Sequence, residues 1–270
     1  MERNSDQLDH RIVGDDMQCV EITLDPGETV IAEAGTLMMM DAGIRMQTIF
    51  GSGDGKEQSF MDKLWGAGKR VLTGESLFMT TYTNDSPERR TAWFAAAYPG
   101  KIMALDLREF RGKLVCQKDS FLCAAKGVSI GIEFSRKLGR GLFGGEGFIM
   151  QKLEGDGQVY IHAGGTTVQK ELLPGEVLRV DTGCLVAMTE QVDYDIEFVG
   201  GIRNTLFGGE GLFFALLKGP GKVFLQTLPF SRLADRVIKA SGIQRGGTRG
   251  ESRGLAGLGG GLLKDIISGD

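Results

Sequence analysis

The strongest constraint on the fold is an internal repeat. The sequence Leu-Phe-Gly-Gly-Glu-Gly occurs at residues 142–147 and again at 206–211, an offset of 64 residues. The flanking segments 132–134 and 196–198, both Ile-Glu-Phe, match at the same offset. A weaker third copy lies upstream, where residues 74–77 read Gly-Glu-Ser-Leu. Repeats of this kind indicate one structural unit that is built several times along the chain.

The local pattern inside the copies is that of β-strands. Residues 177–180 and 194–198 alternate in polarity or are β-branched and aromatic. Glycine supplies 42 of the 270 residues, and Pro-Gly pairs mark tight turns at 26–27, 99–100 and 174–175. The sequence therefore predicts an all-β body of three pseudo-threefold internal β repeats. A single unit cannot cover its own apolar face, so the three are expected to share one core.

The repeats are expected at about residues 20–107, 108–170 and 171–229. Each copy opens on a glycine that is followed ten residues later by a leucine. The glycines are Gly27, Gly112 and Gly175, and the leucines are Leu37, Leu122 and Leu185. Because equal spacing places residues on the same face of equivalent strands, we expect the three leucines to be buried at equivalent points.

The pattern changes after Pro229. Ser231 is expected to cap a short helix that carries Leu233 and Val237. Residues 1–240 are thus interpreted as a single β body. Residues 241–270 are interpreted as a flexible Gly/Arg-rich tail with a short apolar end. Residues 232–253 carry a net charge of +4 against −4 for the whole chain, so the tail either contacts something anionic or is a solvated linker.

Several classes of protein are disfavoured. No run of 18 apolar residues predicts a transmembrane helix, and the polar N-terminus is unlike a signal peptide. The four cysteines have no zinc spacing and are expected to be reduced and buried. With two histidines, His10 and His162, neither a metal site nor another cofactor is expected. This composition best fits a cytoplasmic protein that is either free or peripheral to a membrane.

The Gly-Glu turns, the segment 74–80 (Gly-Glu-Ser-Leu-Phe-Met-Thr) and the Gly/Leu-rich end resemble one known family. This is the altered-inheritance-of-mitochondria (AIM-type) mitochondrial-biogenesis family, whose bacterial members are mostly labelled uncharacterised. The resemblance covers about residues 10–240. It implies a double-stranded β-helix body similar in fold to the tryptophan RNA-binding attenuation proteins, that is, TRAP-like. It implies no established activity and transfers no functional residues.

No catalytic constellation stands out. Residues 139–144 match Gly-x-Gly-x-x-Gly, but the other copy of the repeat at 203–208 lacks two of these glycines, so a turn explains them better than a dinucleotide site. Ser76 follows Gly74-Glu75, yet Leu77-Phe78 replaces the closing glycine of a nucleophile elbow. We therefore expect no enzymatic activity.

The repeated Gly-Glu turns are interpreted as structural. The glycine allows a positive φ, and the carboxylate accepts backbone N–H groups across the turn. The alternative is an acidic ring at one end of the body. The turn residues are Gly74, Glu75, Gly145, Glu146, Gly209 and Glu210.

Basic and apolar residues are interleaved in the segments beside these turns. The candidate surface-binding residues are Lys63, Trp65, Lys69, Arg70, Arg136, Lys137, Arg140 and Arg203. This mixture suits an anionic membrane surface, a groove on a protein partner or single-stranded nucleic acid. The alternative is an ordinary capping loop over the core.

The sequence thus predicts a non-catalytic interaction or scaffold protein. It is expected to self-associate as a homo-oligomer and to engage a membrane surface or a protein partner through its basic-apolar loops and tail. The alternative hypothesis is a small-ligand or RNA-binding β module. Binding to RNA would depend steeply on salt, whereas binding to vesicles that needs the tail would favour the first hypothesis.

Overall fold

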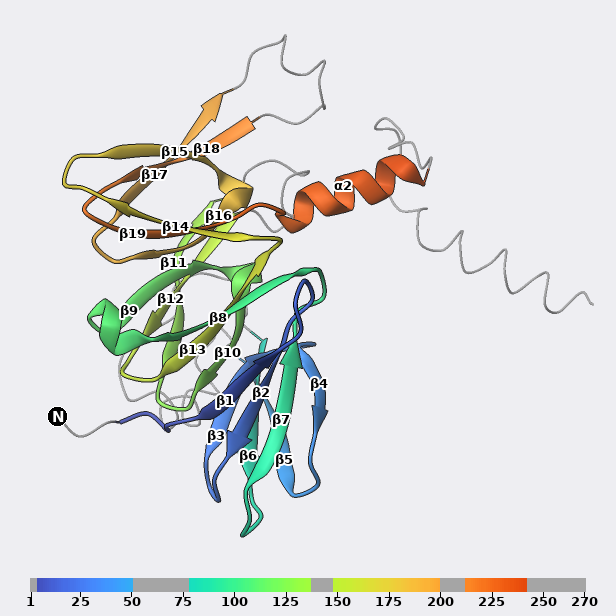
Figure 1. Cartoon of the computed structure of the whole chain (residues 1–270). Helices are drawn as coiled ribbons and strands as arrows, with labels where there is room; N and C mark the ends of the chain where they lie inside the picture. The colour runs from blue at the N-terminus through green and yellow to red at the C-terminus, as the bar shows by residue number, and fades with distance from the viewer. Residues whose placement is uncertain (1–3, 51–77, 137–147, 200–211, 242–270) are drawn as a thin grey trace, which may run out of the picture. The chain divides into compact units, whose positions relative to one another are not determined.

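The computed structural model describes residues 4–50, 78–136, 148–199 and 212–241 (Figure 1). The described residues form antiparallel β-sheets and one helix near the C-terminus, which confirms the expected mainly β fold. The chain divides into two units, Met1–Leu233 and Ala234–Asp270, and all described strands belong to the first. No helix in the described ranges is long and apolar enough to cross a bilayer.

The strands fall into three strand sets of six, preceded by β1 (Asp9–Val13). The first set contains β2 (Cys19–Leu24), β3 (Thr29–Glu33), β4 (Leu37–Met40), β5 (Ile44–Phe50), β6 (Phe78–Asn84) and β7 (Arg90–Ala95). The second contains β8 (Gly100–Asp106), β9 (Lys113–Gln117), β10 (Phe121–Ala125), β11 (Ser129–Arg136), β12 (Phe148–Glu154) and β13 (Gln158–Gly164). The third contains β14 (Thr167–Leu172), β15 (Val177–Asp181), β16 (Leu185–Thr189), β17 (Asp193–Val199), β18 (Leu212–Lys218) and β19 (Gly221–Gln226). Short 3-10 helices occupy Leu107–Phe110, Lys118–Ser120 and Thr182–Cys184.

The same antiparallel pairings recur in every strand set. In the first set, β2 and β4 flank β7, while β3 and β5 flank β6. The second and third sets repeat this order with their own six strands. The sets begin at Cys19, Gly100 and Thr167, somewhat before the expected repeat starts, because β8 pairs with β13 and β14 pairs with β19.

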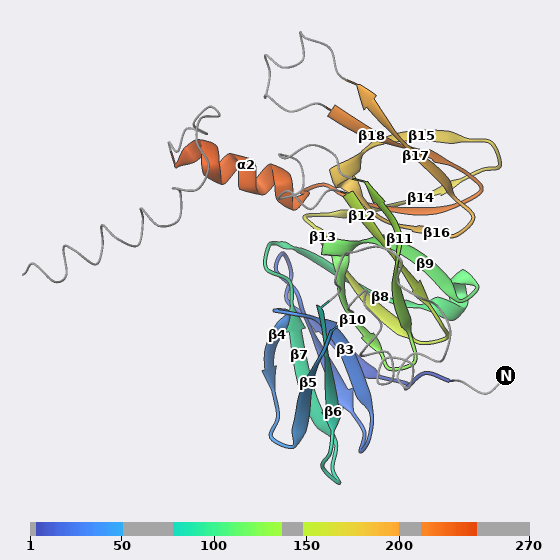
Figure 2. The ribbon, with the colours of Figure 1, turned by 180° about the vertical axis from the view of Figure 1, so that it is seen from behind.

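Neighbouring strand sets are joined by shared sheets. Strand β3 of the first set pairs with β10 of the second, and β9 of the second pairs with β16 of the third. Two six-stranded sheets result, with the orders β5-β6-β3-β10-β13-β8 and β11-β12-β9-β16-β19-β14. The remaining sheets are β1-β2-β7-β4 and β15-β18-β17 (Figures 1 and 2).

The buried apolar residues form three clusters, so the expectation of one shared core is wrong. Each strand set encloses a cluster between its two three-stranded halves. In the first set, for example, the rings of Tyr82 and Phe94 meet edge to face at 5.2 Å. A strand at a junction contributes side chains to two clusters. In β3, Val30 and Ala32 pack into the cluster of the first set, and Ile31 packs into the cluster of the second set. No set buries its apolar surface alone.

The equivalence expected between the three leucines is off by one residue in the second set. Leu37, Phe121 and Leu185 each start a strand, and a register irregularity follows each of them. Leu122 therefore corresponds to the residues after Leu37 and Leu185. Leu122 and Leu185 are buried as expected, whereas Leu37 is half-buried.

The reason for this shift is the turn before β9. Gly27 and Gly175 lie two residues before β3 and β15 and have φ of 86° and 80°. Arg111, with φ of 58°, has this position before β9. The second set thus uses an arginine where the others use glycine, and the sequence comparison aligned the next residue, Gly112.

The C-terminal helix α2 spans Phe230–Ala240 and begins one residue before the expected cap. Ser231 is therefore inside the helix. The carbonyl of Pro229 accepts the N–H groups of Arg232 and Leu233 and so starts the first turn. Arg232 donates to Asp181 at 2.8 Å, which ties the start of the helix to the end of β15.

Candidate functional site

Most residues singled out by the sequence lie outside the described residues. This holds for the surface-binding candidates Lys63, Trp65, Lys69, Arg70, Lys137, Arg140 and Arg203. It also holds for the turn residues Gly74, Glu75, Gly145, Glu146, Gly209 and Glu210. Arg136 is described as the last residue of β11, where it pairs with Phe148 of β12.

The segments that carry these candidates start and end at equivalent places. Phe50 is opposite Phe78, Arg136 is opposite Phe148, and Val199 is opposite Leu212. Each segment thus connects the fourth and fifth strands of its strand set, which are β5–β6, β11–β12 or β17–β18. The described strands accordingly support the alignment of the three segments that the sequence predicted.

The turn mechanism expected for Gly-Glu pairs operates at two other positions. In the turn before β3, Glu28 Oε2 accepts the N–H of Asp25 at 2.8 Å. In the equivalent turn before β15, Glu176 Oε2 accepts the N–H of Leu173 at 3.0 Å. A glutamate that follows a Pro-Gly pair therefore closes the turn with its carboxylate, which is a structural role.

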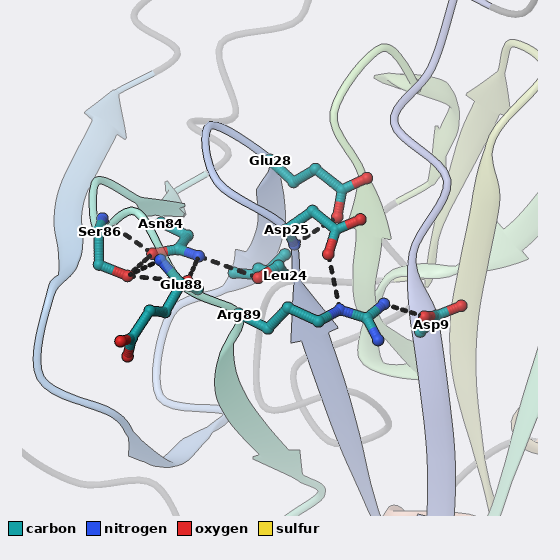
Figure 3. A network of polar contacts seen from close by, with 8 residues as sticks. All are labelled: Asp9, Leu24, Asp25, Glu28, Asn84, Ser86, Glu88 and Arg89. Carbon is teal, nitrogen blue, oxygen red and sulfur yellow. Dashed lines mark hydrogen bonds and ion pairs between the residues drawn. The ribbon is translucent and has the colours of Figure 1, made fainter.

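An ionic network joins the ends of β1, β2 and β7 (Figure 3). Arg89 donates to Asp25 at 2.6 Å and also contacts the carboxylate of Asp9. The pKa of Glu28 is raised, mainly by partial burial and further by repulsion from Asp25, Asp6 and Asp9. Because Arg89, Asp9 and Asp25 are all more than half exposed, these pairs add little to stability.

The neighbouring turn is held by a fully buried amide (Figure 3). Asn84 Nδ2 donates to the carbonyls of Leu24 at 2.9 Å and Glu88 at 2.8 Å. Its Oδ1 accepts both the N–H and the hydroxyl of Ser86. All hydrogen-bonding capacity of the side chain is used within the fold, so this network is structural and offers no site for a ligand.

Burial shifts the pKa of several titratable groups in the interior that the structure describes. Burial lowers the pKa of His162 to about 4, and its ring lies 4.6 Å from that of Tyr98. The pKa values of the Cys116 and Cys123 thiols are raised by burial. All four cysteines are free, and Cys19 and Cys184 are only half-buried. In the described part of the chain, no group of three His, Cys, Asp or Glu side chains could hold a metal ion.

The most informative surface consists of two strand edges, β4 and β15. Strand β4 is the third strand of its set, and its counterparts β10 and β16 each pair with a strand of the preceding set. Strand β15 is the second strand of its set, and its counterparts β3 and β9 each pair with a strand of the following set. Among the described strands, β4 pairs with β7 alone and β15 with β18 alone. Each therefore presents one row of backbone N–H and C=O groups without a strand opposite.

Burial differs sharply between these edges and their counterparts. Every residue of β10 and β16 is buried. In β4, by contrast, Met38, Met39 and Met40 are 57%, 46% and 38% exposed. In β15, Val177 is 58% exposed and Arg179 is also exposed. The two edges thus expose apolar side chains at positions that are covered elsewhere in the same molecule.

Edge strands usually carry charged residues or proline that prevent pairing with another chain. Strand β4 reads Leu-Met-Met-Met and contains neither. Flexible methionine side chains are common on surfaces that bind other proteins. The run of three methionines, Met38 to Met40, is visible in the sequence. The sequence pattern does not predict this surface, because it does not show which strands pair.

The fold and these surfaces define a mainly β protein of linked antiparallel sheets with exposed strand edges. The chain belongs to the Mitochondrial biogenesis AIM24 family, whose model matches residues 10–228. This confirms the family that the Gly-Glu repeats indicated.

Two bacterial proteins are similar to this chain. An uncharacterized protein of Streptococcus pyogenes serotype M6 is 30% identical over 219 residues, which cover 80% of this chain and 83% of that protein. The X-ray crystal structure of a Streptococcus pyogenes protein superposes with a TM-score of 0.66 at 22% identity and covers 87% of this chain and 100% of that chain. The second similarity supports the fold alone.

Proposed function

We propose that this chain is a non-catalytic scaffold that self-associates and holds basic-apolar segments against an anionic membrane surface in the cytoplasm. One observation carries the proposal: the three segments that contain Lys63, Arg140 and Arg203 leave equivalent strand pairs. Equivalent anchoring in a repeated body would present several basic and apolar side chains together. The four free thiols suit a reducing compartment.

We also propose the finer architecture that the sequence suggested. Each strand set would be one unit of a double-stranded β-helix, similar to TRAP-like proteins, and the units would be related by pseudo-threefold repetition. The recurrence of the same six-strand pairing supports this proposal. The register irregularity after Leu37, Phe121 and Leu185 supports it further.

Self-association strengthens the proposed membrane contact. Each basic group near an anionic surface contributes at most about 1 kcal/mol, so a single segment binds weakly. The whole chain carries a net charge of −4, which opposes approach to an anionic surface. An assembly multiplies the basic segments and gains affinity through the high effective concentration of each additional contact.

The test is co-sedimentation with vesicles that contain phosphatidylserine. We expect the full chain to bind at low salt and to be released as salt screens the charges. Deletion of residues 242–270 should weaken binding, and the variant Lys63/Lys69/Arg70/Arg140→Ala should bind much less. A matched control, Lys126/Lys170/Lys218/Lys222→Ala, removes four positive charges outside the segments and should bind like the parent.

Three outcomes would contradict the membrane proposal. The full chain could fail to bind at low salt, both quadruple variants could lose binding equally, or neither could lose it. Salt-dependent binding of single-stranded RNA in place of vesicles would favour the RNA-binding alternative.

A further inference from the structure

The edges of β4 and β15 could pair with each other in the same way as the strands at the two junctions β3–β10 and β9–β16. At both junctions, the third strand of one set pairs antiparallel with the second strand of the preceding set. Among the described strands, β4 is a third strand without such a neighbour and β15 is a second strand without one. In the part of the chain that the structure describes, no strand set pairs with β4 of the first set or with β15 of the third.

We propose that β15 of one copy of this chain pairs antiparallel with β4 of a second copy and so continues the junctions β3–β10 and β9–β16 between molecules. This inference rests on the proposed self-association and names the surface that produces it. The existing junctions also fix the register. Ala187 is opposite Cys116 and Cys123 is opposite Ala32, so Met39 would be opposite Val180 of the second copy.

Strand β4 has the same register irregularity as the two strands that occupy its position at the existing junctions. In β10 and β16, the register shifts immediately after Phe121 and Leu185. Strand β4 has the same shift after Leu37, although no strand lies on its other side in the described residues. The bulged residue Leu122 is buried in the cluster of the preceding set. Met38, its counterpart, is exposed and would be buried in the same way by a second copy.

One position departs from the pattern and provides a test of the register. Ile31 and Val115 are the junction residues that pack into the cluster of the following set. Their counterpart in β15 is Arg179, whose Nη2 lies 3.4 Å from Glu197 Oε2. An arginine can lay its apolar stem along such a surface while its charged end reaches water. Its aliphatic replacement should fit the junction better.

This contact is heterologous, because it joins two different edges. Each copy would use β15 toward one neighbour and β4 toward another. A contact of this type produces a ring if the rotation between copies closes, and an open array if it does not. It therefore differs from a symmetric dimer in a way that mixing experiments detect.

The experiment measures the mass of the full-length chain by size-exclusion chromatography with light scattering over a range of concentrations. We expect assemblies at multiples of the 29.2-kDa chain. Met39→Lys introduces a charge into β4, and Arg179→Asp replaces an apolar stem in β15 with a short carboxylate whose charge cannot reach water across the junction. Each should weaken association by at least about tenfold. Arg179→Val should tighten it. The matched controls are Met46→Lys, also at an exposed methionine, and Arg11→Asp, whose arginine is 67% exposed like Arg179 and also forms an ion pair.

Mixing the two edge variants gives the decisive result. The Met39→Lys copy keeps an intact β15, and the Arg179→Asp copy keeps an intact β4. At concentrations where each variant alone is monomeric, an equimolar mixture should form a dimer that grows no further. Circular dichroism of each variant establishes that it is folded.

The failure of this inference is distinguishable from the failure of the proposed function. If the parent chain is monomeric throughout, both the self-association and the inference are wrong. If the parent assembles but the edge variants keep its mass, or if their mixture forms no dimer, self-association stands and the β15–β4 pairing is wrong. Arg179→Val that associates more weakly than the parent would overturn the register. Vesicle binding is measured separately on the monomeric variants, so the membrane contact is judged independently.

Discussion

Arg111 shows how a single residue can hide a repeat. At the equivalent turn the other strand sets have glycine, which adopts a positive φ without a steric penalty. Arg111 adopts the same left-handed conformation at φ of 58°. Because an L-residue pays about 1–2 kcal/mol for that conformation, the sequence comparison favoured the adjacent Gly112, and the predicted register was off by one.

Arg111→Gly should therefore stabilise the chain, because it removes the steric cost of the left-handed turn. We expect a gain of about 0.5–1 kcal/mol, since the greater backbone entropy lost by glycine offsets part of the relief. Gly175→Ala is the reciprocal change. No atom lies within 4 Å of the added Cβ, so steric contacts do not contribute to the effect. The variant should therefore lose about 1–2 kcal/mol of folding stability, all of it from the backbone conformation. Denaturant midpoints measure both, and a destabilised Arg111→Gly variant would show that the arginine side chain contributes more than its backbone costs.

His162 should make the stability of the chain depend on pH. Burial lowers its pKa in the folded protein to about 4, against 6.5 for an unperturbed histidine. The unfolded chain therefore binds a proton more readily, and the contribution of neutral His162 is full above pH 6.5 and is lost as the pH falls toward 4. The loss should reach about 3 kcal/mol. His162→Gln should reduce this dependence in urea melts between pH 7 and 4.5, and parallel curves for the two proteins would contradict the assignment.

At the scale of the elements, the sequence predicted strands well and their grouping less well. Alternation and Pro-Gly turns correctly indicated strands at 177–180 and 194–198, which lie within β15 and β17. The expectation of one core failed because β-pairing across a junction cannot be read from local periodicity. Strands β3 and β9 pair with strands more than 60 residues away, and no turn signal records such a contact.

The residues at the register irregularities allow the contribution of a junction to folding stability to be measured. Leu122, buried between the first two sets, should cost about 2–5 kcal/mol when replaced by alanine, because the change leaves a cavity. Met38 is its exposed counterpart, and Met38→Ala should cost less than about 0.5 kcal/mol in the dissociated chain. Melts at concentrations below the assembly range compare the two. Equal losses would mean that the two positions are not equivalent.

At the scale of the whole molecule, the sequence indicated which segments combine basic and apolar residues. The structure shows which strand edges have no neighbour among the described strands. The basic-apolar residues such as Lys63 and Arg140 could be found because charge and hydrophobicity are visible in a sequence. An edge is defined by a missing neighbour, so β4 could be identified only when its counterparts β10 and β16 were seen paired. The family and the mainly β fold followed from the repeat, while the proposed interface could be inferred only from the order in which the strands pair.

The sharing of each six-stranded sheet between two strand sets also bears on how such a chain could change in length. A gene duplication or deletion that spans one repeat of six strands, such as the 64 residues from Lys113 at the start of β9 up to the start of β15 at Val177, would rebuild the same junction at the splice. The product would still end in one β4-type edge and one β15-type edge. Evolution could thus vary the number of units per polypeptide and leave the proposed pairing of β15 with β4 between polypeptides unchanged.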